Sequence, residues 1–252
     1  MVILKTTRDL EKMKKAGEIS VGALKTAKDA IKPGVTTAQI NRKVHEYILS
    51  RGAKPLFLGY RDFPASVCIS INEEVIHGIP SDRTVKDGDI VSIDVGAEFE
   101  GYCGDNAATF AAGDADEETL RLMRLTRECL FRGISAAKKG NRIGDISFAV
   151  QSLAEDNGCS VVREFTGHGV GRKLHEDPSV PNFGPAGRGP RLIPGMTIAI
   201  EPMINAGKSA IEILGDGWTV TTKDGSYSAH FEMTIAITEK EPVILTDWRE
   251  VI

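Results

Sequence analysis

The feature that most constrains the fold of this 252-residue chain is a weak similarity between its two halves. An offset of about 106 residues superposes five pairs of identical residues: Leu24 on Leu130, Gly34 on Gly140, Ile40 on Ile146, Val44 on Val150 and Gly52 on Gly158. Such self-similarity indicates an internal duplication, and a chance match of common residues is the alternative. We therefore expect a single domain made of two related halves, at about residues 1–112 and 113–252.

Each half has the pattern of helices followed by strands. Thr6-x-x-Asp9 and Thr36-x-x-Gln39 are capping-box patterns that precede apolar residues at helical spacing. Helical spacing returns from about 117 to 139 and from 144 to 156. Apolar or alternating runs predict strands at these ranges: 66–71, 90–97, 107–111, 194–204, 217–222 and 229–238. This order predicts an α+β fold with a pseudo-two-fold relation, in which a central antiparallel sheet carries helices on its outer face.

Two aspartates flank a turn near Glu100 in the first half, namely Asp94 in SIDVG and Asp105 in YCGDNA. They are equidistant from that turn, so we expect a hairpin to place them opposite one another on one face. Facing carboxylates repel each other unless a cation or a proton compensates their charge. Two ordinary aspartates at strand ends on a solvated face are the alternative.

The second half contributes two glutamates within apolar strand sequences, Glu201 in AIAIEPM and Glu232 in HFEMTIAI. A charged acid is rarely buried unless it is paired or bound to a metal. With two acids in each half, we expect four carboxylates to meet in the crevice between the halves.

Histidine is scarce, since the chain holds five, and two of them lie in one glycine-rich stretch. His168 and His175 fall within GHGVGRKLHEDP, and His77 in NEEVIHGIP follows a predicted strand directly. Four acids with one histidine suit a pair of divalent first-row ions such as Mn, Fe, Co or Zn. Two such ions can share a bridging water, lower its pKa and stabilise a tetrahedral oxyanion during hydrolysis. The four cysteines form no C-x-x-C pair and exclude cysteine-based zinc chemistry.

At these residues the chain resembles the type I methionine aminopeptidases, which have a duplicated "pita-bread" metallohydrolase fold. The resemblance covers essentially the whole chain and rests on these segments: SVCISINEEVIHGIP, GDIVSIDVGAEFEGYCGDNAATF, EFTGHGVGRKLHEDP, MTIAIEPM and DGWTVTTKDGSYSAHFEMTIAIT. It implies a dinuclear metal-dependent exopeptidase that removes the initiator methionine when the second residue is small.

The resemblance also implies the roles of individual residues. The five metal ligands would be Asp94, Asp105, His168, Glu201 and Glu232, with Asp105 and Glu232 bridging the two ions. Glu201 would also move a proton, while His77 and His175 would bind the scissile peptide and its developing charge. The methionine pocket would be formed by Phe57, Tyr60, Phe63, Cys68, Leu174 and Trp218, with His77 and His175 close by.

Three residues depart from the pattern of the family. Asn106 stands where a small hydroxyl residue is usual, Leu174 where an aromatic residue is common, and His230 where a glutamine is common. None of the three changes removes an expected ligand.

Two other functions fit parts of the sequence. An X-prolyl aminopeptidase or prolidase shares the ligands and the paired-histidine loop, but such relatives usually carry a large extra N-terminal domain. A non-catalytic pita-bread binding module is the second alternative, and such modules generally lose ligands.

Charge and hydropathy bear on partners and location. The net charge of −4 argues against nucleic acid as a partner, and no stretch approaches the roughly 18 apolar residues that span a bilayer. Residues 1–15 do not resemble a signal peptide. We expect a cytoplasmic monomer without membrane contact, whose partners by resemblance are the N-termini of nascent polypeptides near the ribosome.

Overall fold

The computed structural model describes residues 1–251 and contains four α-helices in that range. The helices are α1 (Thr7–Ala30), α2 (Thr37–Ser50), α3 (Glu117–Ala136) and α4 (Ile143–Asp156). The two predicted capping boxes are formed, because the Thr6 and Thr36 hydroxyls accept the N–H groups of Asp9 and Gln39. No helix within residues 1–251 is both long enough and apolar enough to cross a membrane.

The two helix pairs are related by the same offset as the sequence. Helices α1 and α3 end at Ala30 and Ala136, and α2 and α4 begin and end 106 residues apart. Gly34 and Gly140 follow α1 and α3 with φ of 93° and 90°, a left-handed conformation that favours glycine. A duplication produces such matched helix ends. The exact boundary between the halves, near residue 112, remains a proposal.

Fifteen strands are described, and nine of them form the central sheet. The strands are β1 (Lys54–Pro55), β2 (Cys68–Ile71), β3 (Glu74–Ile76), β4 (Ile90–Phe99), β5 (Tyr102–Ala111), β6 (Ser160–Val161), β7 (Thr166–Gly169), β8 (Glu176–Pro181), β9 (Thr197–Ile200), β10 (Met203–Asn205), β11 (Ile211–Ile213), β12 (Val220–Thr222), β13 (Ser228–His230), β14 (Glu232–Ala236) and β15 (Val243–Ile244). The main path is β1-β4-β5-β14-β9-β7-β8, with antiparallel pairing throughout. In the central sheet, strands from before and after residue 112 therefore meet where β5 pairs with β14.

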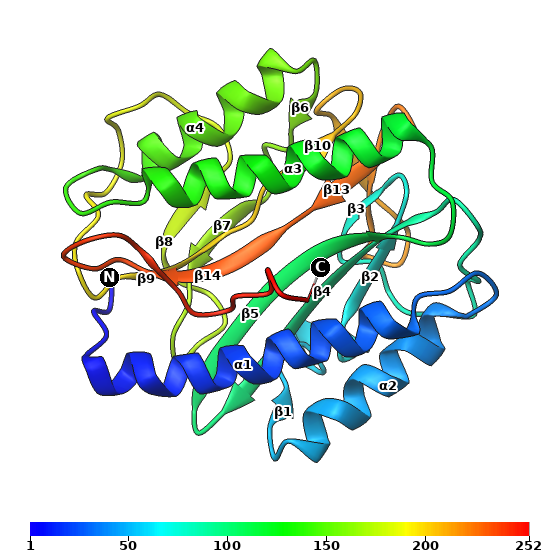
Figure 1. The fold of residues 1–252 in the computed structure, drawn as a ribbon, viewed down its shortest axis with the longest axis horizontal. Coiled ribbons are helices and arrows are strands. Elements are labelled where there is room, and N and C mark those ends of the chain that lie inside the picture. The colour runs from blue at the N-terminus through cyan, green and yellow to red at the C-terminus, as the bar shows by residue number, and fades with distance from the viewer. Residues whose placement is uncertain (252) are drawn as a thin grey trace.

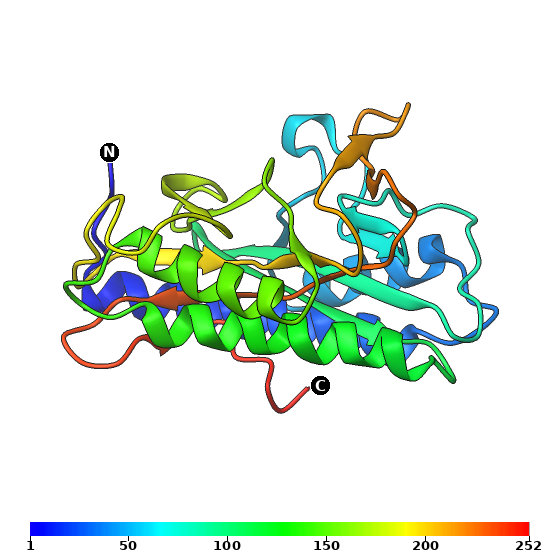
Figure 2. The ribbon, with the colours of Figure 1, turned by 90° about the horizontal axis from the view of Figure 1, so that it is seen from above.

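The helices and the site-bearing loops lie on opposite faces of this sheet. Figure 1 shows α1 and α2 along one side of the molecule and α3 and α4 along the other, and Figure 2 shows loops rising from the far face of the sheet. The largest hydrophobic core joins helix residues such as Leu24 and Leu130 to strand residues such as Ile93 and Ile235. The predicted α+β arrangement, with helices on the outer face of an antiparallel sheet, is confirmed.

Two predicted strands are divided in the structure. The range 194–204 becomes β9 and β10, which belong to different sheets, and the break falls at Glu201 and Pro202. Proline has no N–H for the ladder, which favours such a break. The range 229–238 likewise divides into β13 and β14 at Phe231. As a result, Glu201 directly follows one central strand and Glu232 begins its neighbour.

The β4–β5 hairpin corrects one prediction. Asp94 lies opposite Ala107, and Asp105 lies opposite Gly96, so the two aspartates do not face each other directly. The turn consists of Glu100 and Gly101, both with positive φ, and this two-residue turn centres the hairpin one residue later than expected. Ala107 and Asp105 are two residues apart on β5, so the aspartates still share one face of the sheet.

Candidate active site

A cavity of about 110 Å³ lies on the loop-bearing face of the sheet. It is lined by Phe57, Tyr60, Phe63, Cys68, Ile76, His77, Asp94, Asp105, Phe165, Thr166, His168, Leu174, His175, Glu201, Trp218 and Glu232. Every residue that the sequence predicted for the site is in this set. The cavity therefore brings together the acids, the histidines and the apolar residues that were expected to act together.

The five expected ligands come from five neighbouring strands. Asp94 lies on β4, Asp105 on β5, Glu232 on β14, Glu201 directly after β9, and His168 on β7. These strands are consecutive in the sheet, in the order β4-β5-β14-β9-β7. The pairing of β5 with β14 therefore lies in the middle of the acidic group.

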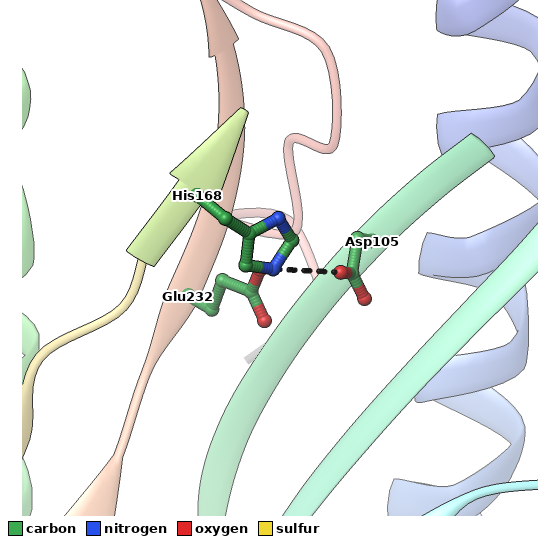
Figure 3. Close-up of side chains that lie close together, drawn as sticks. All are labelled: Asp105, His168 and Glu232. Atoms are coloured by element: carbon green, nitrogen blue, oxygen red, sulfur yellow. Dashed lines mark ion pairs between the residues drawn. The ribbon is translucent and has the colours of Figure 1, made fainter. Parts of the chain in front are cut away.

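The acids and His168 approach one another closely at this junction. The Nε2 atom of His168 lies 3.6 Å from Oδ2 of Asp105 and 3.5 Å from Oε1 of Glu201. Figure 3 shows Asp105, His168 and Glu232 converging from three strands, and one ligand atom of each lies within 4.8 Å of the other two. This spacing lets three side chains reach one ion.

The chemistry of these residues fits a divalent cation. Asp94 Oδ1, Asp105 Oδ1 and Glu232 Oε1 are buried oxygens without a hydrogen-bond partner among the described residues. Buried polar atoms are nearly always paired in native proteins, so three orphaned carboxylate oxygens at one place call for a ligand. Carboxylates with imidazole are a suitable donor set for first-row divalent ions.

Electrostatics supports the same interpretation. Burial raises the pKa of Asp94 to about 7. Burial also raises the pKa values of Asp105, Glu201 and Glu232 well above the ordinary range, and the charges of neighbouring acids add to this rise. The carboxylates would therefore hold protons near neutral pH unless a cation compensated their charge.

His77 and His175 face the cavity from two loops. His77 follows β3 with a φ of 59°, an uncommon conformation for a residue other than glycine, and its ring packs edge-on against Phe165 and Trp218. His175 places Nδ1 2.8 Å from the Tyr60 hydroxyl. Burial lowers the pKa of His77 to about 4 and also lowers that of His175, which favours neutral imidazoles at pH 7.

An apolar wall adjoins the acids. Phe57, Phe63, Cys68 and Leu174 are buried in one cluster with Ala65, and Tyr60 and Trp218 pack against it. Cys68 on β2 pairs with Asp94 on β4, so no other strand separates the apolar wall from the acidic residues.

Three lining residues were missed by the sequence reasoning: Ile76, Phe165 and Thr166. Each is within three residues of His77 or His168 in the chain. Their nearness to those histidines is the signal that could have identified them.

The three departures from the family pattern lie in different places. Asn106 is on the opposite side of β5 from Asp105, where its amide donates to Ser20 Oγ and to the Val95 carbonyl. Leu174 lines the cavity, whereas His230 does not and instead lies behind Glu201, with Nε2 3.9 Å from Oε2. Of the three side chains, only that of Leu174 lines the cavity and only that of His230 approaches an expected ligand.

Comparisons with known proteins agree with this geometry. The model of metallopeptidase family M24 matches residues 11–239. The methionine aminopeptidase of Clostridium perfringens is 51% identical over 246 residues, which cover 98% of this chain and 99% of that protein. The crystal structure of methionine aminopeptidase from Rickettsia prowazekii is similar with a TM-score of 0.97 and 43% identity, over 98% of this chain and 100% of that one.

A more distant structure bears on the prolidase alternative. Prolidase from Pyrococcus furiosus is 25% identical with a TM-score of 0.80, and the match covers 97% of this chain but 65% of that one. The methionine aminopeptidases match with higher sequence identity and a higher TM-score, and the match covers a larger share of their own chains. The chain belongs to metallopeptidase family M24, and within it to the methionine aminopeptidases with their duplicated pita-bread fold.

Proposed function

We propose that this chain removes the initiator methionine from proteins whose second residue is small. The observation that carries the proposal is that one cavity of about 110 Å³ joins a closed apolar wall to the acid and histidine group. An apolar slot favours an unbranched, polarizable thioether and disfavours a charged side chain, because the charge would lose its hydration.

Two divalent ions complete the proposed site. Asp94, Asp105, His168, Glu201 and Glu232 would hold them. By the family resemblance Asp105 and Glu232 would serve both ions, and these two residues lie on the paired strands β5 and β14. Such ions supply Lewis acidity, which polarises a carbonyl and makes water nucleophilic at neutral pH. Their identity among Co, Mn, Fe and Zn depends on availability as well as on affinity.

The side chains of the chain itself perform the remaining steps. The Glu201 carboxyl accepts a proton from the attacking water and passes it to the leaving amine. His175 and His77 are neutral donors placed to bind the peptide group and the negative charge that develops on its oxygen. The free α-amine of the substrate would be a further ligand for the bound metal, so an internal peptide bond should be a poor substrate.

The proposed substrates are the N-termini of nascent polypeptides as they leave the ribosome. The enzyme would then act in the cytoplasm as a monomer, without nucleic acid or membrane as a partner of its own. The net charge of −4 argues against nucleic acid as a partner.

Peptide turnover tests the proposed function. Met-Ala-Ser should be cleaved with a much higher kcat/KM than Leu-Ala-Ser, because a branched side chain fits the slot poorly. Met-Lys-Ser should be cleaved poorly, because a bulky second residue would meet the walls around His77 and His175. A norleucine peptide should react moderately well, since small apolar changes are worth about 1–3 kcal/mol in such pockets.

Two outcomes would reject this assignment. Equal kcat/KM for the first three peptides would indicate a generic aminopeptidase. Faster turnover of Ala-Pro than of Met-Ala-Ser would favour the prolidase alternative.

A further inference from the structure

The loop that carries His175 is held by a carboxylate that does not line the cavity. Glu176 begins β8, and its Oε1 accepts the backbone N–H groups of Arg172 at 2.9 Å and Lys173 at 3.2 Å. The side chain of Glu176 therefore closes the loop 171–176 on itself. His175 is inside that closed loop, directly before Glu176.

The other oxygen of Glu176 binds the segment that precedes α1. The ammonium group of Lys5 lies 2.5 Å from Oε2, and the two side chains are each only 5% exposed. The backbone N–H of Lys5 in turn donates to the Gly195 carbonyl at 2.7 Å. A buried ion pair with these further hydrogen bonds keeps one specific arrangement of its backbone.

A side chain at Gly171 would displace this ion pair. A Cβ atom at that position would lie 2.5 Å from Glu176 Oε1 and 2.5 Å from Lys5 Cε. The Gly171 carbonyl also accepts the N–H of Cys103 on β5 at 2.8 Å. The loop, the ion pair and the central sheet are therefore fitted to one another.

A second contact joins the same loop to the start of α1. The Arg172 guanidinium lies over the Tyr102 ring at 4.5 Å and donates to its hydroxyl at 2.7 Å. The Tyr102 hydroxyl donates to Asp9, which forms the capping box of α1 with Thr6. The segment around residues 5–9 thus holds the loop at both Glu176 and Arg172.

We propose that Lys5 is a positioning residue for His175 and acts through Glu176. The inference rests on the proposed function, in which the His175 imidazole binds the reacting peptide group. His175 has one described hydrogen bond of its own, to the Tyr60 hydroxyl, and its ring packs against the rings of Tyr60 and His168. The backbone of the loop determines whether the imidazole reaches these partners. Without the Lys5 ammonium, Glu176 would be a buried charge without a cation, and it would turn away from the loop.

The test compares Lys5→Met with Lys5→Arg, which keeps the cation, and with Lys25→Met. Lys25 is a matched control, because it forms an ion pair of the same 2.5 Å length with Asp29 on α1 but is over half exposed. We expect Lys5→Met to lower kcat on Met-Ala-Ser by about 10–100-fold, the usual result of a small misplacement of a reacting group. KM and bound metal should change little, and Lys5→Arg should recover most of the loss.

Two further measurements separate positioning from a general loss of stability. In a His175→Ala background, Lys5→Met should change kcat by less than about two-fold, because the residue through which it acts is gone. Amide exchange at Arg172 and Lys173 should be faster in Lys5→Met than in Lys25→Met. An equal loss of kcat with and without His175, or unchanged amide exchange, would overturn the proposal.

The exchange measurement does not depend on activity. If the wild-type protein cleaved no methionine peptide, the proposed function would fail, whereas faster exchange at Arg172 and Lys173 in Lys5→Met would still support the Lys5 and Glu176 connection. Glu176→Gln provides an independent variant and should accelerate exchange at the same two amides.

Discussion

The Nε2 atom of His230 points at the Glu201 carboxylate from behind the cavity, 3.9 Å from Oε2. His230 is 1% exposed, and this nitrogen has no hydrogen-bond partner among residues 1–251. A small rotation would let its N–H donate to Glu201. His230 is therefore close enough to orient Glu201, which is expected to bind metal. The family resemblance implies that glutamine is common at this position.

We predict that His230→Leu weakens metal binding by about 10–100-fold, the usual effect of losing a partner behind a ligand. His230→Gln keeps an N–H donor and should lose much less. Titration of the metal-free protein with Mn in the presence of a competing chelator measures both affinities. Wild-type affinity in His230→Leu would show that this nitrogen does not support Glu201.

Replacing a proposed ligand should have a larger effect on metal content. We predict that His168→Ala and Glu232→Ala each abolish binding of the second ion, because both side chains lie at the strand junction where the acids converge. Elemental analysis of the purified proteins measures the metal content, and His45→Ala, outside the cavity, is the control. Near-normal activity of either variant would show that the ligand assignment is wrong.

The two cavity histidines that are not proposed ligands should behave differently. His175→Ala should lower kcat by about 10²–10³-fold with a smaller change in KM, as expected for a donor aimed at developing oxyanion charge. His77→Ala should act similarly. Metal content should stay normal in both, and outright loss of metal in either would make that histidine a ligand.

The locally encoded parts of this structure could be predicted from the sequence. Helix starts follow from capping boxes such as Thr6 with Asp9, and helix ends follow from glycines such as Gly34 that need a positive φ. These signals lie within a few residues of the feature they determine. The break at Glu201 and Pro202 is also encoded locally, because the proline indicates that the strand predicted at 194–204 is interrupted there.

Features that depend on register or on distant packing were harder to predict. The partner of Asp94 across the hairpin depends on where the Glu100–Gly101 turn is centred. An error of one residue in that centre shifts each cross-strand partner by two residues. Phe165 reaches the cavity because its ring packs against His77, far away in the chain. Periodicity contains no information about such a contact.

The stability of the metal-free protein should depend on pH in a definite direction. Burial raises the pKa of Asp94 from 3.8 to about 7 and raises those of Asp105, Glu201 and Glu232 as well. The folded state then binds more protons than the unfolded state, so stability falls as pH rises through this range. The buried histidines act in the opposite sense, because their folded pKa values are lowered, and this opposing contribution fades as pH rises above their unfolded pKa of about 6.5.

We therefore predict that the Tm of the metal-free protein falls between about pH 6.5 and pH 8, where the carboxylates contribute more to the slope than the histidines do. Saturating divalent metal should remove this slope, because the ion compensates the ionised acids. Asp94→Asn should reduce it. Calorimetry at several pH values measures the slope, and a Tm that rises with pH over this interval would contradict the account.

The most direct test of the whole account is methionine release from Met-Ala-Ser by chelated protein to which Mn, Fe, Co or Zn is returned, with N-acetylated Met-Ala-Ser measured in parallel. The account predicts no release without metal, recovery with at least one of the ions, and little release from the acetylated peptide because its amine is blocked. Failure of every ion to restore release, or equal cleavage of the free and acetylated peptides, would contradict it.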